Sequence, residues 1–208
     1  NTVYPVTVDP SFYGISDDMV EASIYKPTNS ASTKYVDVGA VTAFPSVGRM
    51  LIDFPGLYND RIYKGLTADQ IVSADMNIYC YAFRNTGYIK AYTYSGPAWS
   101  DSRPSNVEYV YGIWNGFNST AKTYRITPET KAFYNINITN AVKQWREGTY
   151  PERGLIVVNS FEDSIHDCVR IYTREDFYAQ MRSAFTVTYG KVTKVYPLLD
   201  TDKPEVSR

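Results

Sequence analysis

The sequence predicts an all-β protein, built as a sandwich or a barrel. Short segments in which apolar and polar residues alternate recur along the chain, and clusters of Gly, Asn, Ser and Pro separate them, which is typical of short strands joined by turns. The 20 tyrosines point the same way, because tyrosine favours strands and binding surfaces. A chain of 208 residues can bury one sizeable core, so disulfide or metal staples are not required.

The alternation is clearest between Ala74 and Ala82, where alternate apolar residues point to one side and polar and aromatic residues to the other. In chain order, the other predicted strands lie at 6–8, 20–24, 35–38, 48–54, 88–94, 107–113, 132–136, 154–159, 169–173 and 184–189. Turns are predicted at 29–30, 85–87, 95–97 and 115–116.

One short helix is predicted near the middle of the second half. Thr139 or Asn140 can serve as its N-cap, and Gly148 supplies the left-handed residue that ends it. Val142 and Trp145 lie three residues apart and therefore share a face. We expect Trp145 to plug the core beneath the sheets.

The remaining segments predict connections and a domain boundary. A long connection covers 55–70, with a helical turn near 67–70, and 174–182 is irregular or helical. Residues 1–190 are predicted to form a single domain, and 191–208 an extension that links it to another domain of the same chain. The first residues lack both a Met and the features of a signal peptide, so we expect the chain to be an excised or processed piece.

Composition argues against several functions. A net charge of −1 is unlike that of an electrostatic nucleic-acid binder, and 44% hydrophobic residues are unlike a disordered chain. No apolar run approaches the about 20 residues that a membrane-spanning helix needs. One His and two Cys leave little for metal, thiol or Ser-His chemistry, and no HExxH, GxSxG or P-loop pattern is present. We therefore expect no enzymatic activity, no nucleic-acid partner and no membrane span.

The two cysteines leave two interpretations open. Cys80 lies on the inward face of a predicted strand, and Cys168 lies at the start of another. They can form one disulfide, as in secreted proteins, or remain two separate buried thiols.

Ten segments follow one another in a distinctive order. They read YPVTVDP (4–10), DDMV (17–20), YVDVG (35–39), GRMLIDF (48–54), VSADMNIY (72–79), WS (99–100), NITNAVKQW (137–145), GLIV (154–157), IYTRE (171–175) and FTVTY (185–189). Over about residues 3–190 this series resembles the DNRLRE-type domains of secreted bacterial and archaeal proteins. The resemblance implies a jelly-roll β-sandwich of two antiparallel sheets with one short helix, and some relatives of that family are carbohydrate-binding modules.

The sequence departs from the pattern of that family in three places. Met50 and Asp53 stand where the family usually has a Ser and a basic residue, and only Trp99–Asp101 matches its tryptophan-rich centre. The connection after Phe54 is also longer than usual. Because these changes fall partly where a ligand face would lie, the identity of the ligand does not carry over.

Aromatic residues in the divergent centre suggest a sugar-binding surface. Sugar rings present flat C–H faces that pack on Tyr and Trp rings, and their hydroxyls need polar neighbours. The candidate carbohydrate-binding residues are Tyr88, Tyr92, Tyr94, Trp99, Arg103, Tyr109, Tyr111 and Trp114. The alternative is that these rings pack against one another across strands, which stabilises any sheet.

No cofactor is predicted, although one alternative is a structural Ca²⁺ held by loop oxygens. Its candidate ligands are Asp17, Asp18, Asp163 and Asp167, which otherwise are solvated loop acids. No EF-hand spacing is present.

The first functional hypothesis is a non-catalytic carbohydrate-binding module of a larger secreted or cell-surface bacterial protein. Its partners would be a polysaccharide or a cell-surface glycan, together with other domains of the same chain. The second is a structural or adhesive spacer with no small ligand, and the third is a glycan-active enzyme domain. Three or more coplanar exposed aromatic rings along one groove would favour binding, whereas buried rings would favour the spacer.

Overall fold

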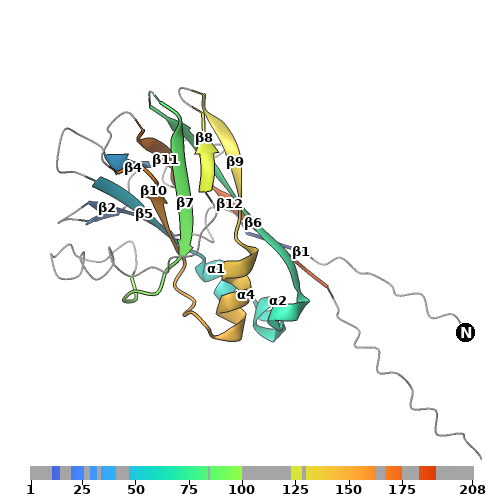
Figure 1. Ribbon diagram of the computed structural model, residues 1–208. Coiled ribbons are helices and arrows are strands. Elements are labelled where there is room, and N and C mark those ends of the chain that lie inside the picture. The colour runs from blue at the N-terminus through green and yellow to red at the C-terminus, as the bar shows by residue number, and fades with distance from the viewer. Residues whose placement is uncertain are drawn as a thin grey trace, which may run out of the picture.

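The computed structural model shows an all-β, jelly-roll-like sandwich with a few short helices (Figure 1). It describes residues 34–40, 47–83, 85–99, 123–127, 130–162, 167–174 and 183–190, and the backbone alone of 11–14, 20–25 and 29–31. All strand pairs in these ranges are antiparallel, so the predicted fold class is confirmed.

The strands are β1 (Ser11–Gly14), β2 (Val20–Tyr25), β3 (Asn29–Ala31), β4 (Tyr35–Ala40), β5 (Val47–Asp53), β6 (Ile71–Ala82), β7 (Gly87–Thr93), β8 (Thr123–Ile126), β9 (Ala132–Asn137), β10 (Leu155–Asn159), β11 (Val169–Tyr172) and β12 (Ala184–Tyr189). The helices are α1 (Pro55–Asn59), α2 (Arg61–Gly65), the 3₁₀ turn η2 (Ala68–Gln70) and α4 (Thr139–Glu147).

The strands form two sheets that share β4. Sheet A contains β1, β12, β6, β9, β11 and the first part of β4, and sheet B contains the end of β4 with β5, β10, β7, β8, β2 and β3. The chain turns from one sheet to the other at Gly39, whose φ of 116° is open mainly to glycine. A Cβ at Gly39 would also press on the buried Asn159, whose amide donates to the Val38 carbonyl at 3.2 Å.

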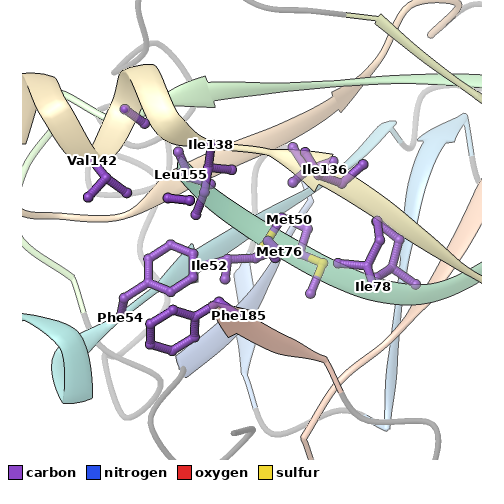
Figure 2. Close-up of a cluster of buried hydrophobic side chains, with 14 of the residues drawn as sticks. Met50, Ile52, Phe54, Met76, Ile78, Ile136, Ile138, Val142, Leu155 and Phe185 are labelled. Atoms are coloured by element: carbon purple, nitrogen blue, oxygen red, sulfur yellow. The ribbon is translucent and has the colours of Figure 1, made fainter. Parts of the chain in front are cut away.

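The core lies between the two sheets and is built from the alternate residues of their strands (Figure 2). Met50 and Ile52 of β5 face Met76 and Ile78 of β6, and all four are fully buried. Burying one such side chain contributes about 1.5–3 kcal/mol to folding. The alternation read from the sequence therefore identified the inward faces correctly.

Helix α4 closes one end of the core as predicted. Trp145 is 3% exposed, and its ring packs edge-on against Tyr58 at 5.5 Å. Gly148 ends the helix with a φ of 73°. The predicted N-cap is wrong, because the Thr139 hydroxyl pairs with the backbone of Ala74 on β6 instead.

Several local predictions need correction. The connection 55–70 contains α1 and α2 as well as the expected turn near 67–70. Strand β3 occupies 29–31, where a turn was expected, and β1 and β8 were not predicted. Four residues, as in β8, show too few alternations to separate a strand from a loop. The predicted segments 6–8, 107–113, 115–116 and 175–182 lie outside the described residues.

Tyrosine hydroxyls join β8 of sheet B to β9 of sheet A, which lie side by side in Figure 1. The Tyr124 hydroxyl accepts from the Asn137 N–H at 2.8 Å, and the Tyr134 hydroxyl accepts from the Thr127 N–H at 2.9 Å. Tyrosine hydroxyls thus replace backbone hydrogen bonds between strands at the edge where β8 and β9 meet.

No helix of the described residues is long and apolar enough to cross a membrane.

Candidate functional site

The structure buries two of the aromatic residues that were predicted to meet a ligand. Tyr94 is 0% exposed and Trp99 is 8% exposed, so the expectation of an exposed ring is wrong for both. Both rings can be buried because the polar group of each side chain donates a hydrogen bond to a backbone carbonyl. The Tyr94 hydroxyl donates to the Pro97 carbonyl at 2.9 Å, and the Trp99 indole N–H donates to the Arg153 carbonyl at 3.0 Å.

We call residues 94–99 the Trp99 loop. The backbone at Arg153 and Gly154 lies close to this loop and holds it in place. The Arg153 guanidinium donates to the Gly96 carbonyl at 2.6 Å, and the Tyr94 N–H donates to the Gly154 carbonyl at 2.9 Å. Gly154 has a φ of 80°, and a Cβ there would collide with the Ile52 carbonyl. The Trp99 loop is therefore a packed corner of the fold.

Tyr88 and Tyr92 are half-buried on β7 and share the outer face of sheet B. The Tyr88 ring packs edge-on against Phe161 at 5.7 Å. The two tyrosines are four residues apart, about 13 Å along a strand, so they form no continuous surface by themselves. The other predicted binding residues, Arg103, Tyr109, Tyr111 and Trp114, lie outside the described residues.

The ranges that the structure describes contain no group of three or more His, Cys, Asp or Glu side chains placed to hold a metal ion. Asp167 is half-buried, and its backbone carbonyl accepts from the Asn159 amide at 2.6 Å. The other candidate calcium ligands, Asp17, Asp18 and Asp163, lie outside the described residues.

The two cysteines are separate buried thiols. Cys80 of β6 pairs with Ile171, whereas the Cys168 carbonyl accepts from the N–H of Phe83, which directly follows β6 and lies three residues beyond Cys80. That offset is about 10 Å along the strand, more than a disulfide can span. Burial raises the pKa of Cys168 to about 12 and raises that of Cys80 as well, so neither thiol is poised to react.

A larger aromatic surface lies on the outer face of sheet A. Phe133, Tyr79, Tyr172 and Tyr35 come from β9, β6, β11 and β4, and the strand register places them in one line across the sheet, which we call the aromatic row. The rings of Tyr79 and Phe133 lie 5.0 Å apart, and those of Tyr79 and Tyr172 lie 5.5 Å apart. The two ends are the most open, with Phe133 52% and Tyr35 41% exposed.

A second line of side chains lies beside the aromatic row. Tyr81, Arg170 and Asp37 occupy the next outward position on β6, β11 and β4, and Lys131 lies beside them, just before β9. We call these four residues the charged row. The Arg170 guanidinium binds both carboxylate oxygens of Asp37, at 2.7 and 2.8 Å. We call the aromatic and charged rows together the platform.

Stacking holds the two cations of the charged row on the aromatic rings. The Arg170 guanidinium lies 3.6 Å from the ring centroid of Tyr35 and 4.9 Å from that of Phe83. The exposed Lys131 ammonium lies 5.4 Å from the ring centroid of Tyr172 and 5.6 Å from that of Tyr81. A hydrogen bond with the Tyr172 hydroxyl raises the pKa of Lys131, which keeps its positive charge.

Amide side chains border the aromatic row on its other side. Asn135 of β9 pairs with Asn77 of β6, and both side chains point outward, as those of Phe133 and Tyr79 do. We call this pair the amide row. At Phe133 and Tyr79 the aromatic row therefore lies between the charged row and the amide row, and this arrangement suits a ligand with apolar faces and polar edges.

Sequence reasoning did not find the platform. Alternation in β6 correctly placed Tyr79 and Tyr81 opposite the core, but it could not show which side chains lie beside them. Tyr35 and Tyr172 fall inside the strands predicted at 35–38 and 169–173 and were not among the candidate binding residues. The available signal was the outward position of two consecutive alternate tyrosines on the longest predicted strand.

Comparisons with known proteins add no relative. A scan against protein-family models and a search of curated protein sequences each found no match.

Proposed function

We propose that this chain is a non-catalytic carbohydrate-binding module that holds a glycan on the platform of sheet A. The observation that carries the proposal is the aromatic row, in which four rings from four strands lie in one line on an outer face. Sugar rings pack their C–H faces on such rings. The exposure of Phe133 and Tyr35 leaves the ends of the row open to solvent.

Polar groups next to the aromatic row can satisfy the hydroxyls of a sugar. The phenols of Tyr79 and Tyr172 both donate and accept hydrogen bonds, and the Lys131 ammonium donates. These groups lie next to the aromatic rings, so a sugar that stacks on the rings could hydrogen-bond to them at the same time. This combination of ring faces and donors supports a glycan over a purely apolar ligand.

The charged row supports binding without catalysis. Glycoside hydrolysis needs two carboxylates at a defined separation across the scissile bond. Within the platform the carboxylate is that of Asp37, and Arg170 engages both of its oxygens. A carboxylate held in this way is not available as an acid, a base or a nucleophile.

The wider setting is part of the same proposal. The order of segments that resembles DNRLRE-type domains supports a secreted or cell-surface location in a bacterial protein. The glycan would then be a polysaccharide or a cell-surface glycan met outside the cell, and further domains of the same chain would supply any chemistry.

A structural spacer is the second candidate, and two observations favour it. The platform rings are inclined at 53° and 58° to one another, so they do not meet the criterion of three or more coplanar rings. Neighbouring rings of the platform contact one another at 5.0–6.5 Å, and such pairs each stabilise a sheet by about 0.5–1.5 kcal/mol without any ligand. A spacer would use the rings for stability alone. Binding measurements distinguish the two candidates.

The test is a binding panel of soluble and insoluble polysaccharides with the full chain and two matched variants. Phe133→Ala removes an exposed ring from the platform, and Phe161→Ala removes a similarly exposed ring that follows β10 and packs on Tyr88 of sheet B (52% against 48% exposed). We expect Phe133→Ala to weaken binding about tenfold, the equivalent of one lost aromatic contact, and Phe161→Ala to leave it unchanged.

Two results would contradict the proposal. Absence of binding to every polysaccharide would favour the spacer. Loss of binding in Phe161→Ala with none in Phe133→Ala would move the site to sheet B, where Tyr88 and Tyr92 lie. Thermal unfolding followed by circular dichroism confirms that both variants are folded.

A further inference from the structure

We infer that the platform takes a single, unpacked glycan chain lying across the strands, and not the flat face of a crystalline polysaccharide. This inference rests on the proposed function and adds the physical form and the direction of the ligand. Four features carry it: the tilts of the rings, the length of the aromatic row, the polar side chains on both sides of it and the twist of the sheet.

The rings of the platform do not share a plane. Tyr79 and Phe133 are inclined at 58° to each other, and Tyr79 and Tyr172 at 53°. A crystal face is flat and rigid, so it can lie flush against only one ring of each such pair. A free chain turns at every glycosidic bond, so successive sugars can present their faces to successive tilted rings.

The aromatic row has the length of a short oligosaccharide. Its four residues lie on four neighbouring strands, and three strand spacings of about 4.8 Å give a row of about 14 Å. A glycan that lies perpendicular to the strands can place one sugar on each of the four rings. The row therefore matches about four sugars that run perpendicular to the strands.

The polar side chains on both sides of the aromatic row can bind the two edges of a glycan chain only if both edges are free. A sugar that stacks on Tyr79 directs its ring hydroxyls sideways, toward Lys131 and Tyr81 on one side and toward Asn77 and Asn135 on the other. In a crystal, neighbouring chains already bond to those edges. Only a chain with both edges free can use both rows.

The sheet itself imposes a twist on the row. Neighbouring strands of a sheet are rotated by about 20–25° in a constant sense. Side chains that cross four strands follow that rotation, which adds to the departure from a flat surface. A flexible chain can follow the twist, whereas a crystalline sheet of chains cannot.

The test compares two physical forms of each polymer with the full chain. Calorimetry measures binding to soluble hexasaccharides of β-1,4-linked glucose, N-acetylglucosamine, mannose and xylose, and sedimentation measures binding to microcrystalline cellulose and crystalline chitin. For the polymer that binds, we expect the soluble form to bind about tenfold or more tightly than the crystalline one. Affinity should rise with chain length to about four sugars and then level off.

Matched variants test the role of the amide row. Asn135→Ala removes an exposed amide beside the aromatic row, and Asn140→Ala removes an exposed amide on α4. We expect the first to weaken binding of the hexasaccharide about fivefold, the usual loss for one hydrogen bond, and the second to leave it unchanged.

The outcomes separate this inference from the proposed function. Equal or tighter binding to the crystalline form, or an affinity already complete with a monosaccharide, would overturn the single-chain inference and leave carbohydrate binding intact. An unchanged affinity in Asn135→Ala would likewise overturn the two-edged contact. Binding to neither form of any polymer would overturn the proposed function, and the inference with it.

Discussion

The platform on sheet A and the Trp99 loop beside sheet B are both rich in aromatic rings, yet the fold uses them in opposite ways. In the Trp99 loop, hydrogen bonds to carbonyls at Pro97 and Arg153 satisfy the polar tips of Tyr94 and Trp99, so both rings can be buried. On the platform, the rings lie on an outer face, and Phe133 and Tyr35 remain 52% and 41% exposed. Aromatic residues near a turn therefore do not by themselves indicate a binding surface.

The largest expected effect is on the free energy of unfolding, and it compares the loss of one aromatic ring from each of the two regions. Tyr94→Ala removes a fully buried ring and should lower the free energy of unfolding by about 3–5 kcal/mol. Phe133→Ala removes one exposed partner of a cross-strand pair and should cost less than about 1 kcal/mol. Urea denaturation followed by circular dichroism measures both changes.

A conservative variant separates the ring of Tyr94 from its hydroxyl. Tyr94→Phe keeps the ring and loses the hydrogen bond to Pro97, so it should cost only about 1 kcal/mol. If Phe133→Ala proved as destabilising as Tyr94→Ala, the platform would be a second core, and the contrast between the two regions would collapse.

The second prediction concerns the ion pair that braces the platform. Arg170→Lys keeps the charge but loses the two-pronged contact with Asp37 and the stacking on Tyr35, and should cost about 1–2 kcal/mol. Because the guanidinium also supports the Tyr35 ring, we expect this variant to weaken glycan binding about fivefold. Unfolding and calorimetry measure the two effects on the same protein.

Sheet B supplies a matched control for this prediction. Arg49 binds both carboxylate oxygens of Glu162 at 2.9 Å, on the outer face opposite the platform. Arg49→Lys should lower stability to a similar or smaller extent and leave glycan binding unchanged. An equal loss of binding in both variants would show that the effect reports general loosening and not support of Tyr35.

The sequence predicted the sheets better than the surface. An inward face depends on the alternation within one strand, so Met76 and Ile78 were placed correctly from local pattern alone. Short strands such as β3 and β8 carry too little pattern and were missed.

The candidate site depends on information that no local pattern contains. Tyr79 meets Phe133 and Tyr172 only because β6 pairs with β9 on one edge and with β11 on the other, and these strands are far apart in the chain. The burial of Trp99 likewise depends on a carbonyl at Arg153, more than fifty residues away. Register and long-range hydrogen bonds decided which rings are free, and neither can be read from alternation.

The smallest expected effect concerns a carboxyl group behind the Trp99 loop. Burial raises the pKa of Asp53, although the Phe54 N–H and the Tyr58 hydroxyl both bond to its carboxylate. The Tyr58 hydroxyl also accepts from the Gly154 N–H at 2.9 Å, which ties this carboxyl group to the backbone that buries Trp99. The groups that shift the pKa of Asp53 include no arginine. Asp37 on the platform, by comparison, binds the guanidinium of Arg170.

This difference predicts a pH dependence with a definite sign. Because the folded state holds the Asp53 proton more tightly than the unfolded chain, ionisation of Asp53 lowers stability as pH rises through the folded pKa, and the contribution is fully restored below the unfolded value of 3.8. Relative to Asp53→Asn, the unmodified protein should therefore gain free energy of unfolding as pH falls from neutral toward 4. Urea denaturation of both proteins across this range measures the difference, and a difference that is constant or grows in the opposite direction would show that the hydrogen bonds from Phe54 and Tyr58 outweigh burial.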